Sequence, residues 1–305
     1  MSKIQQALQR LQREDKSQGK TTAAPLPETV IPIARKKTVE LQGEKFHVDQ
    51  EQLIRGGLLA PLDQAIPVAG EFRRIKRPLL DNAARNMPND DEEHMNVIMV
   101  ASAMPGAGKT FCSVNLAASI SLERELNVLL IDADVAKPHV SSAFGLADRR
   151  GLLDLLIDDS LSFEDVIVRT DLNDLQVLPA GAKHSQSTEL LASDKMAELL
   201  HEVATRYEDR IIVMDSPPLL LTSEAPAVSR LAGQIALVIE SGKTTTSAIE
   251  DALELLDKDK AINVILNKSL YSQRGGYYGS DKFVEYGHYG FDEEHGKYDP
   301  QATRD

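Results

Sequence analysis

Short apolar runs alternate with helix-like stretches through the middle of the chain, from about residue 96 to residue 268. These runs predict strands at 97–102, 128–132, 175–179, 211–215, 235–239 and 263–267. Between them, the clearest helix is predicted from Thr188 to Tyr207, where apolar residues recur at helical spacing. Because strands that alternate with helices form a mostly parallel sheet covered on both faces, the pattern predicts a doubly wound α/β fold.

The pattern is weaker before this core, which we place at residues 95–268. Residues 1–14 carry apolar side chains at helical spacing and predict a short amphipathic helix, which would lie on the domain or on a partner protein. Residues 15–50 are rich in Lys, Thr, Pro and Gln and predict a flexible linker. Residues 51–94 form an N-terminal extension, in which Pro78 is expected to end a helix.

A small-residue loop follows the first predicted strand and precedes a helix-like stretch. It reads Ala103-Met104-Pro105-Gly106-Ala107-Gly108-Lys109-Thr110, followed by Phe111. In a phosphate-binding loop, backbone N–H groups hold the phosphates, Lys109 reaches the β and γ phosphates, and Thr110 ligates Mg²⁺. The usual first glycine is Ala103 here, and the alternative is a glycine-rich turn with a surface lysine. The strand before it and the helix after it favour nucleotide binding by residues 105–111.

Carboxylates end two of the later strands, Asp132 with Asp134 close behind it, and Asp215. The carboxyl ends of parallel strands face the ligand crevice of an open sheet. We expect Asp215 and Asp132 to hold Mg²⁺ partly through water, beside Thr110, so ATP and Mg²⁺ are the predicted cofactors. Asp132 or Asp134 would accept the proton of an attacking hydroxyl. Asn267 ends the last strand and is expected to read the base, although such an Asn is often a turn residue.

Composition and charge narrow the classes of function. The charged fraction is 27% and the hydrophobic fraction is 42%, which is ordinary for a globular domain. The net charge of −13 argues against a nucleic-acid partner. No apolar run approaches the roughly 18 to 20 residues that cross a bilayer, so a cytoplasmic location is expected. Cys112 is the only cysteine and is expected to be a small packed residue.

The last predicted segment, residues 269–305, is poor in aliphatic residues and rich in tyrosine. Six of the seven tyrosines lie in it: Tyr271, Tyr277, Tyr278, Tyr286, Tyr289 and Tyr298. Such a segment cannot bury that many rings, so their hydroxyls are expected in solvent on a disordered tail. Composition alone favours a low-complexity tail without a specific role. Beside a nucleotide-binding domain, the exposed hydroxyls are candidate phosphoryl acceptors.

Together these motifs resemble the bacterial tyrosine kinases that regulate exopolysaccharide and capsule export. ASAMPGAGKT is similar to the Walker A motif of that family, LLIDADVAKP to its Walker A′ motif and IIVMDSPP to its Walker B motif, and a tyrosine cluster follows. The resemblance implies a P-loop NTPase fold of the MinD/ParA-like type. It also implies a non-specific protein-tyrosine kinase, with Lys109, Asp132, Asp134 and Asp215 as catalytic residues. Phosphorylation of the tail tyrosines, between subunits, would regulate polymer chain length or export.

The resemblance extends to expected partners. Glu71, Arg74 and Arg77 match an E-x-x-R-x-x-R element that mediates ring-like self-association in that family, although the same spacing also suits a solvated helix face. The first residues, MSKIQQALQRLQRE, resemble the subgroup associated with exosortase-linked gene clusters. That subgroup implies a separate membrane-embedded chain-length protein as activator, a tyrosine phosphatase, and attachment to the inner membrane through a partner. One departure is Ala136, where the family usually has Arg.

Two other classes of function use the same fold. Positioning ATPases of the MinD/ParA type carry a signature lysine where this chain has Met104, and they end in a membrane helix or a basic DNA surface. A non-catalytic, nucleotide-gated scaffold of a polysaccharide export machine would use the same binding residues as a kinase.

Overall fold

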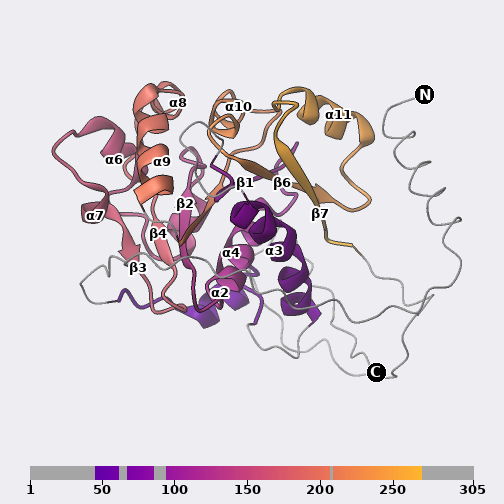
Figure 1. Ribbon diagram of the computed structural model, residues 1–305, viewed down its shortest axis with the longest axis horizontal. Helices are drawn as coiled ribbons and strands as arrows, with labels where there is room; N and C mark the ends of the chain where they lie inside the picture. Colours follow the sequence, from indigo (N-terminus) through magenta and orange to yellow (C-terminus); the bar gives the residue numbers. More distant parts are fainter. Residues whose placement is uncertain (1–44, 62–66, 86–93, 207–208, 270–305) are drawn as a thin grey trace, which may run out of the picture. The chain divides into compact units, whose positions relative to one another are not determined.

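The computed structural model describes residues 45–61, 67–85, 94–206 and 209–269. The described strands form one seven-stranded sheet in the order β3-β4-β2-β5-β1-β6-β7 (Figure 1). The strands are β1 (Val97–Ala101), β2 (Asn127–Asp132), β3 (Val168–Arg169), β4 (Gln176–Leu178), β5 (Arg210–Asp215), β6 (Gln234–Glu240) and β7 (Ala261–Asn267). Every neighbouring pair is parallel except β3 with β4. The predicted doubly wound, mostly parallel sheet is confirmed, with the two-residue β3 added at one edge.

Helices cover both faces of the sheet. They are α2 (Gln50–Arg55), α3 (Pro67–Arg85), α4 (Lys109–Ile120), α5 (His139–Ala143), α6 (Leu152–Ile157), α7 (Phe163–Val166), α8 (Ser187–Leu191), α9 (Asp194–Arg206), α10 (Glu224–Ser229) and α11 (Thr246–Glu254). Alternate residues of β1 enter two separate apolar clusters, Val97 and Met99 on one face and Ile98 and Val100 on the other. The second cluster contains residues of α2, α3 and α4, including Cys112, which is buried as predicted. Among the described residues, no helix is long and apolar enough to cross a membrane.

The helix predicted from Thr188 to Tyr207 is two helices, α8 and α9. Ser193 separates them, because its hydroxyl lies 2.6 Å from the Leu190 carbonyl oxygen and 3.3 Å from the Met196 amide nitrogen. One serine therefore helps to end the first helix and to cap the second. Periodicity alone missed the break because apolar residues of both helices face the same core.

Helix α3 also differs from the prediction, because it continues through Pro78 to Arg85. Proline removes one backbone hydrogen bond from a helix. Contacts on both sides of Pro78 hold the helix: Phe72 and Leu79 are buried, and Gln234 of β6 donates to the Leu79 carbonyl at 3.0 Å. Tertiary packing thus outweighs the local helix breaker.

Residues 45–50, which the sequence assigned to the linker, contact the domain and begin α2 at Gln50. Phe46 pairs with the outer edge of the sheet, where its amide donates to the Arg169 carbonyl at 2.8 Å and its carbonyl accepts from the Asp171 amide at 3.0 Å. Val48 is buried, and its amide donates to the Asp171 carboxylate at 3.0 Å. The predicted helix over 1–14, most of the linker and all seven tyrosines lie outside the described residues.

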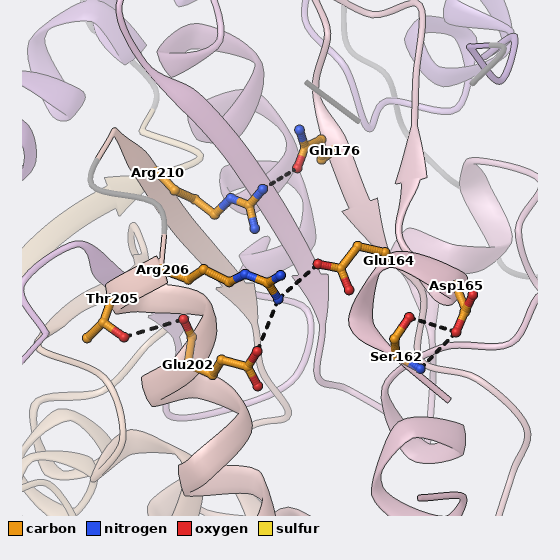
Figure 2. Close-up of polar contacts among 8 residues, drawn as sticks. All are labelled: Ser162, Glu164, Asp165, Gln176, Glu202, Thr205, Arg206 and Arg210. Atoms are coloured by element: carbon orange, nitrogen blue, oxygen red, sulfur yellow. Dashed lines mark hydrogen bonds and ion pairs between the residues drawn. The ribbon is translucent and has the colours of Figure 1, made fainter. Parts of the chain in front are cut away.

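Polar contacts fasten α9 to α7, as Figure 2 shows. The Arg206 guanidinium lies 3.0 Å from the Glu164 carboxylate and 3.2 Å from that of Glu202. Nearby, Arg210 is fully buried at the start of β5 and donates to Gln176 at 3.0 Å. Its guanidinium also lies 5.4 Å from the centre of the Phe163 ring. These contacts tie the helices to the strand whose other end carries Asp215.

Candidate nucleotide site

A cavity of about 750 Å³ opens at the carboxyl ends of the central strands. It is lined by Gly57, Leu58, Pro105, Gly106, Gly108, Lys109, Thr110, Phe111, Asp134, Ala136, Lys137, His139, Pro217, Pro218, Leu221, Thr222, Asn267 and Lys268. This volume lies within the range of small-molecule sites. The cavity therefore brings together most of the predicted catalytic and nucleotide-binding residues, which come from distant parts of the chain.

The phosphate loop joins β1 to α4, as the sequence predicted. Gly106 and Gly108 have φ angles of 80° and 94°, in the left-handed region that side chains rarely adopt. A Cβ atom at Gly108 would also lie 2.1 Å from Nδ2 of Asn267. Position 108 therefore requires glycine for both its backbone conformation and the close approach of a neighbouring side chain.

Lys109 begins α4 and is only 8% exposed. Burial lowers the pKa of its ammonium group, and the negative charges of Asp215 and Asp134 oppose that shift. A buried cation on the wall of a cavity, at the N-terminus of a helix, is suited to a polyanionic ligand.

Asp215 ends β5 and is fully buried beside the phosphate loop. Its carboxylate accepts hydrogen bonds from the Thr110 hydroxyl at 2.8 Å and the Ser113 hydroxyl at 2.9 Å. Burial raises its pKa to about 6, and the two hydrogen bonds and the Lys109 charge oppose that shift. Ser113 was not among the predicted residues, although its position three residues after Thr110 places both hydroxyls on one helix face.

Asp132 ends β2 directly beside Asp215 in the sheet register. Its Oδ2 atom accepts from the Ser141 amide at 2.8 Å and from the Ser141 hydroxyl at 2.7 Å. Its Oδ1 atom is buried and has no hydrogen-bond partner among the described residues. Burial raises its pKa to about 7, the Ser141 bonds oppose this, and the charges of Asp215 and Asp134 add to it.

Asp134 differs from Asp132 because it lines the cavity. Burial raises its pKa, while the Lys137 amide at 3.2 Å and the charges of Lys109, His139 and Lys137 oppose the shift. Of the two acids that the sequence left as alternatives, Asp134 is therefore the one that a ligand in the cavity can reach. Lys137, to which the role of the family's arginine could have moved, and His139, which was not predicted, also line the cavity.

Asn267 and Lys268, at the end of β7, form hydrogen bonds with the phosphate loop. The Asn267 amide donates to the Ala107 carbonyl at 2.9 Å, and the Lys268 ammonium lies 2.7 Å from the Gly106 carbonyl and 3.3 Å from the Glu240 carboxylate. The predicted role of Asn267 in reading the base stays a prediction, and the structure adds a contact that the sequence did not indicate. Lys268 has a left-handed φ of 56°, and its side chain reaches the phosphate loop at Gly106.

The predicted self-association residues lie on α3, and none of them lines the cavity. Glu71, Arg74 and Arg77 are exposed. Lys76, between them, is buried and lies 2.7 Å from the Glu123 carboxylate and 2.5 Å from the Ser119 carbonyl oxygen. This anchor fixes which face of α3 meets α4 and leaves the three charged residues on the outer face.

A strand, phosphate loop and helix with buried carboxylates at the ends of the neighbouring strands define a P-loop nucleotide-binding domain. In agreement, residues 95–270 match the family model described as an AAA domain.

Comparison with known proteins identifies the family within this class. The chain is 35% identical to the tyrosine-protein kinase YwqD of Bacillus subtilis (strain 168) over 199 residues. This alignment covers 64% of this chain and 82% of that protein. The chain is 36% identical over 258 residues to the succinoglycan biosynthesis transport protein ExoP of Rhizobium meliloti (strain 1021), which covers 79% of this chain but 32% of that longer protein. Among solved structures, the kinase domain of the Escherichia coli tyrosine kinase ETK matches with a TM-score of 0.59 and 28% identity, over 73% of this chain and 86% of that one. The chain belongs to the bacterial tyrosine kinase family.

Proposed function

We propose that this protein is an ATP-dependent tyrosine autokinase that phosphorylates its own C-terminal tyrosine cluster. The observation that carries the proposal is that Lys109, Thr110 and Asp134 line one cavity, and that the buried Asp215 carboxylate accepts a hydrogen bond from Thr110, in a chain of the tyrosine kinase family. Phosphoryl transfer depends mainly on positioning and on charge stabilisation, and these residues are suited to both.

The phosphates of ATP would be held by the backbone of residues 106–110 and by Lys109. Mg²⁺ fits the donors beside them, because the Thr110 hydroxyl and the buried Asp215 carboxylate are hard oxygen ligands, and the unpartnered Oδ1 of Asp132 is a third. Bound there, the ion would neutralise charge on the phosphates. The raised pKa values of Asp132 and Asp215 fit this role, since a buried carboxylate gains most from a nearby cation.

We assign the acceptance of the tyrosine proton to Asp134. It lines the cavity, whereas Asp132 does not and is engaged by Ser141. Burial raises the Asp134 pKa and so makes its carboxylate a better proton acceptor. Lys137 and His139, which also line the cavity, would supply positive charge beside Ala136, where the family usually has Arg.

The acceptors in this proposal are Tyr271, Tyr277, Tyr278, Tyr286, Tyr289 and Tyr298. The phosphoryl group would pass between subunits of a ring-like oligomer that assembles through Glu71, Arg74 and Arg77. Each phosphate adds about −1.5 to −2 charges, so several on an already acidic tail would repel that tail from acidic pockets and loosen the assembly.

In the cell, the kinase would control the chain length or export of an exopolysaccharide, in keeping with the names of its relatives. From the resemblance of its first residues, we also propose that it belongs to the exosortase-associated subgroup. That placement implies activation by a membrane-embedded chain-length protein, reversal by a tyrosine phosphatase, and a cytoplasmic location at the inner membrane.

A mixing experiment tests both the reaction and its direction. A full-length Lys109→Met chain, which keeps every tail tyrosine, is incubated with Mg²⁺-ATP and with a chain truncated after Lys268, which keeps the site. We expect phosphotyrosine on the Lys109→Met chain only when both are present. If intact wild-type chains become phosphorylated and the mixture does not, transfer within one chain replaces transfer between subunits. Nucleotide hydrolysis without phosphotyrosine in either sample, even with the membrane activator supplied, would favour the ATPase or scaffold reading.

A further inference from the structure

A short turn after α2 forms one wall of the nucleotide cavity, although it lies about fifty residues before the phosphate loop in the sequence. Gly57 and Leu58 line the cavity together with Phe111. Gly57 has a φ of 67°, and the amides of Leu58 and Leu59 both donate to the Leu53 carbonyl, at 2.9 and 3.1 Å. The turn is thus closed on α2 at its beginning.

Its far side is held by one buried side chain of α4, Asn115, which is 3% exposed. The Asn115 Oδ1 atom accepts from the Ala60 amide at 2.7 Å. Its Nδ2 atom donates to the Leu58 carbonyl at 2.9 Å and to the Phe111 carbonyl at 2.7 Å. Both ends of the amide are therefore engaged, and three backbone groups depend on it. Two of them belong to the residues that line the cavity, Leu58 and Phe111.

The two parts of the cavity differ in chemistry. At the phosphate loop it offers backbone N–H groups and the Lys109 ammonium, which suit phosphate. At the turn it offers the apolar side chains of Leu58 and Phe111 and the backbone of Gly57, which suit the less polar face of a sugar or base. A nucleoside triphosphate has both kinds of surface, whereas inorganic triphosphate has only the first.

We infer that the Gly57–Leu58 turn contacts the nucleoside part of the bound nucleotide, and that Asn115 is the positioning residue that holds the turn there. The inference rests on the proposed function in that it takes the ligand to be a nucleotide. Asn115 does not line the cavity and acts through Leu58 and Phe111. The selection of a nucleoside is thereby divided between the phosphate-loop helix and the N-terminal extension.

The experiment compares two ligands on the full-length chain, Mg²⁺-ATP and Mg²⁺ with inorganic triphosphate, by calorimetry or by displacement of a fluorescent ATP analogue. Asn115→Ala leaves the Leu58 carbonyl and the Ala60 amide without their partner, so the turn loses its fixed position. We expect the Mg²⁺-ATP affinity to fall about tenfold, which corresponds to about 1.4 kcal/mol. The affinity for inorganic triphosphate is expected to stay within about twofold of wild type, a difference of less than about 0.5 kcal/mol.

Two further variants make the result decisive. Leu58→Ala removes the lining side chain without touching Asn115, so it tests the wall even if Asn115→Ala fails to fold, and it is expected to show the same selective loss. Asn82→Ala is the matched control: Asn82 fastens α3 to the core by donating to Gln234 at 2.9 Å and does not line the cavity. It is expected to lower the thermal midpoint and leave both affinities unchanged.

Equal losses for both ligands in Asn115→Ala and Leu58→Ala would overturn the inference, because they would mean a general loss of structure. Unchanged Mg²⁺-ATP affinity in both variants would overturn it as well. The proposed function fails separately if wild-type protein binds Mg²⁺-ATP without forming phosphotyrosine, whereas a wild-type protein that binds no Mg²⁺-ATP overturns both.

Discussion

The contact between the phosphate loop and the last strand makes a quantitative prediction for Gly108→Ala. The added Cβ atom would occupy a backbone with φ of 94° and would lie 2.1 Å from Nδ2 of Asn267. The left-handed conformation costs about 1–2 kcal/mol for a residue with a side chain. The Asn267 side chain can move away, but only by giving up its bond to the Ala107 carbonyl, worth about 1 kcal/mol.

The expected loss in the free energy of unfolding for Gly108→Ala is therefore about 2–3 kcal/mol. Asn267→Ala alone removes only the hydrogen bond and is expected to cost about 1 kcal/mol. In the double variant that bond is lost once rather than twice, and no Asn267 side chain meets the new Cβ atom. The double variant should be less destabilised than the sum of the single variants by about 1 kcal/mol.

Urea unfolding of the four proteins without nucleotide measures this difference as a double-mutant cycle. A coupling below about 0.3 kcal/mol would refute the close approach of Asn267 to the loop. A neutral Gly108→Ala would refute the left-handed conformation as well.

Three other predictions concern the buried charges. Burial raises the Asp132 pKa to about 7 in the folded protein, whereas the same carboxyl ionises near pH 4 in the unfolded chain, so the stability that this group contributes falls as pH rises from about 4 to 7. Asp132→Asn should flatten the fall in thermal midpoint across that window, and an unchanged slope would contradict the assignment. Ser113→Ala removes a hydrogen bond to the buried Asp215 carboxylate and should destabilise the protein by about 1.5–3 kcal/mol in urea unfolding, against less than about 0.5 kcal/mol for a substitution at the surface. Lys76→Met removes a buried cation from Glu123 and should lower stability without changing the oligomer mass. Arg74→Glu on the exposed face should reduce the oligomer mass measured by light scattering and leave stability within about 0.5 kcal/mol of wild type. The opposite result would assign the stabilising role to Arg74 and the self-association role to Lys76.

The parallel sheet was predictable because its strands are continuous apolar runs that end in site residues, as at Asp132 and Asp215. The phosphate loop was predictable for the same reason, since strand, small-residue loop and helix follow one another within the chain. Local signals failed where a distant contact decides the structure. Ser193 splits a helix whose apolar stripe continues across it, and α3 continues through Pro78 because its inner face is anchored.

The site residues that the sequence did not indicate are those placed by tertiary contacts. Gly57 and Leu58 reach the cavity because Asn115 holds their turn. No local pattern marks such residues. Ser113 is the exception, because its spacing from Thr110 on one helix was a signal in the sequence.

The most direct test of the central claim is a map of phosphotyrosine on purified full-length protein after incubation with Mg²⁺-ATP, by intact mass and by peptide analysis. We predict phosphate on tyrosines between residues 271 and 298 in the wild-type chain, and none in Lys109→Met. Bound and hydrolysed nucleotide with no phosphotyrosine, with the membrane activator present, would contradict the account.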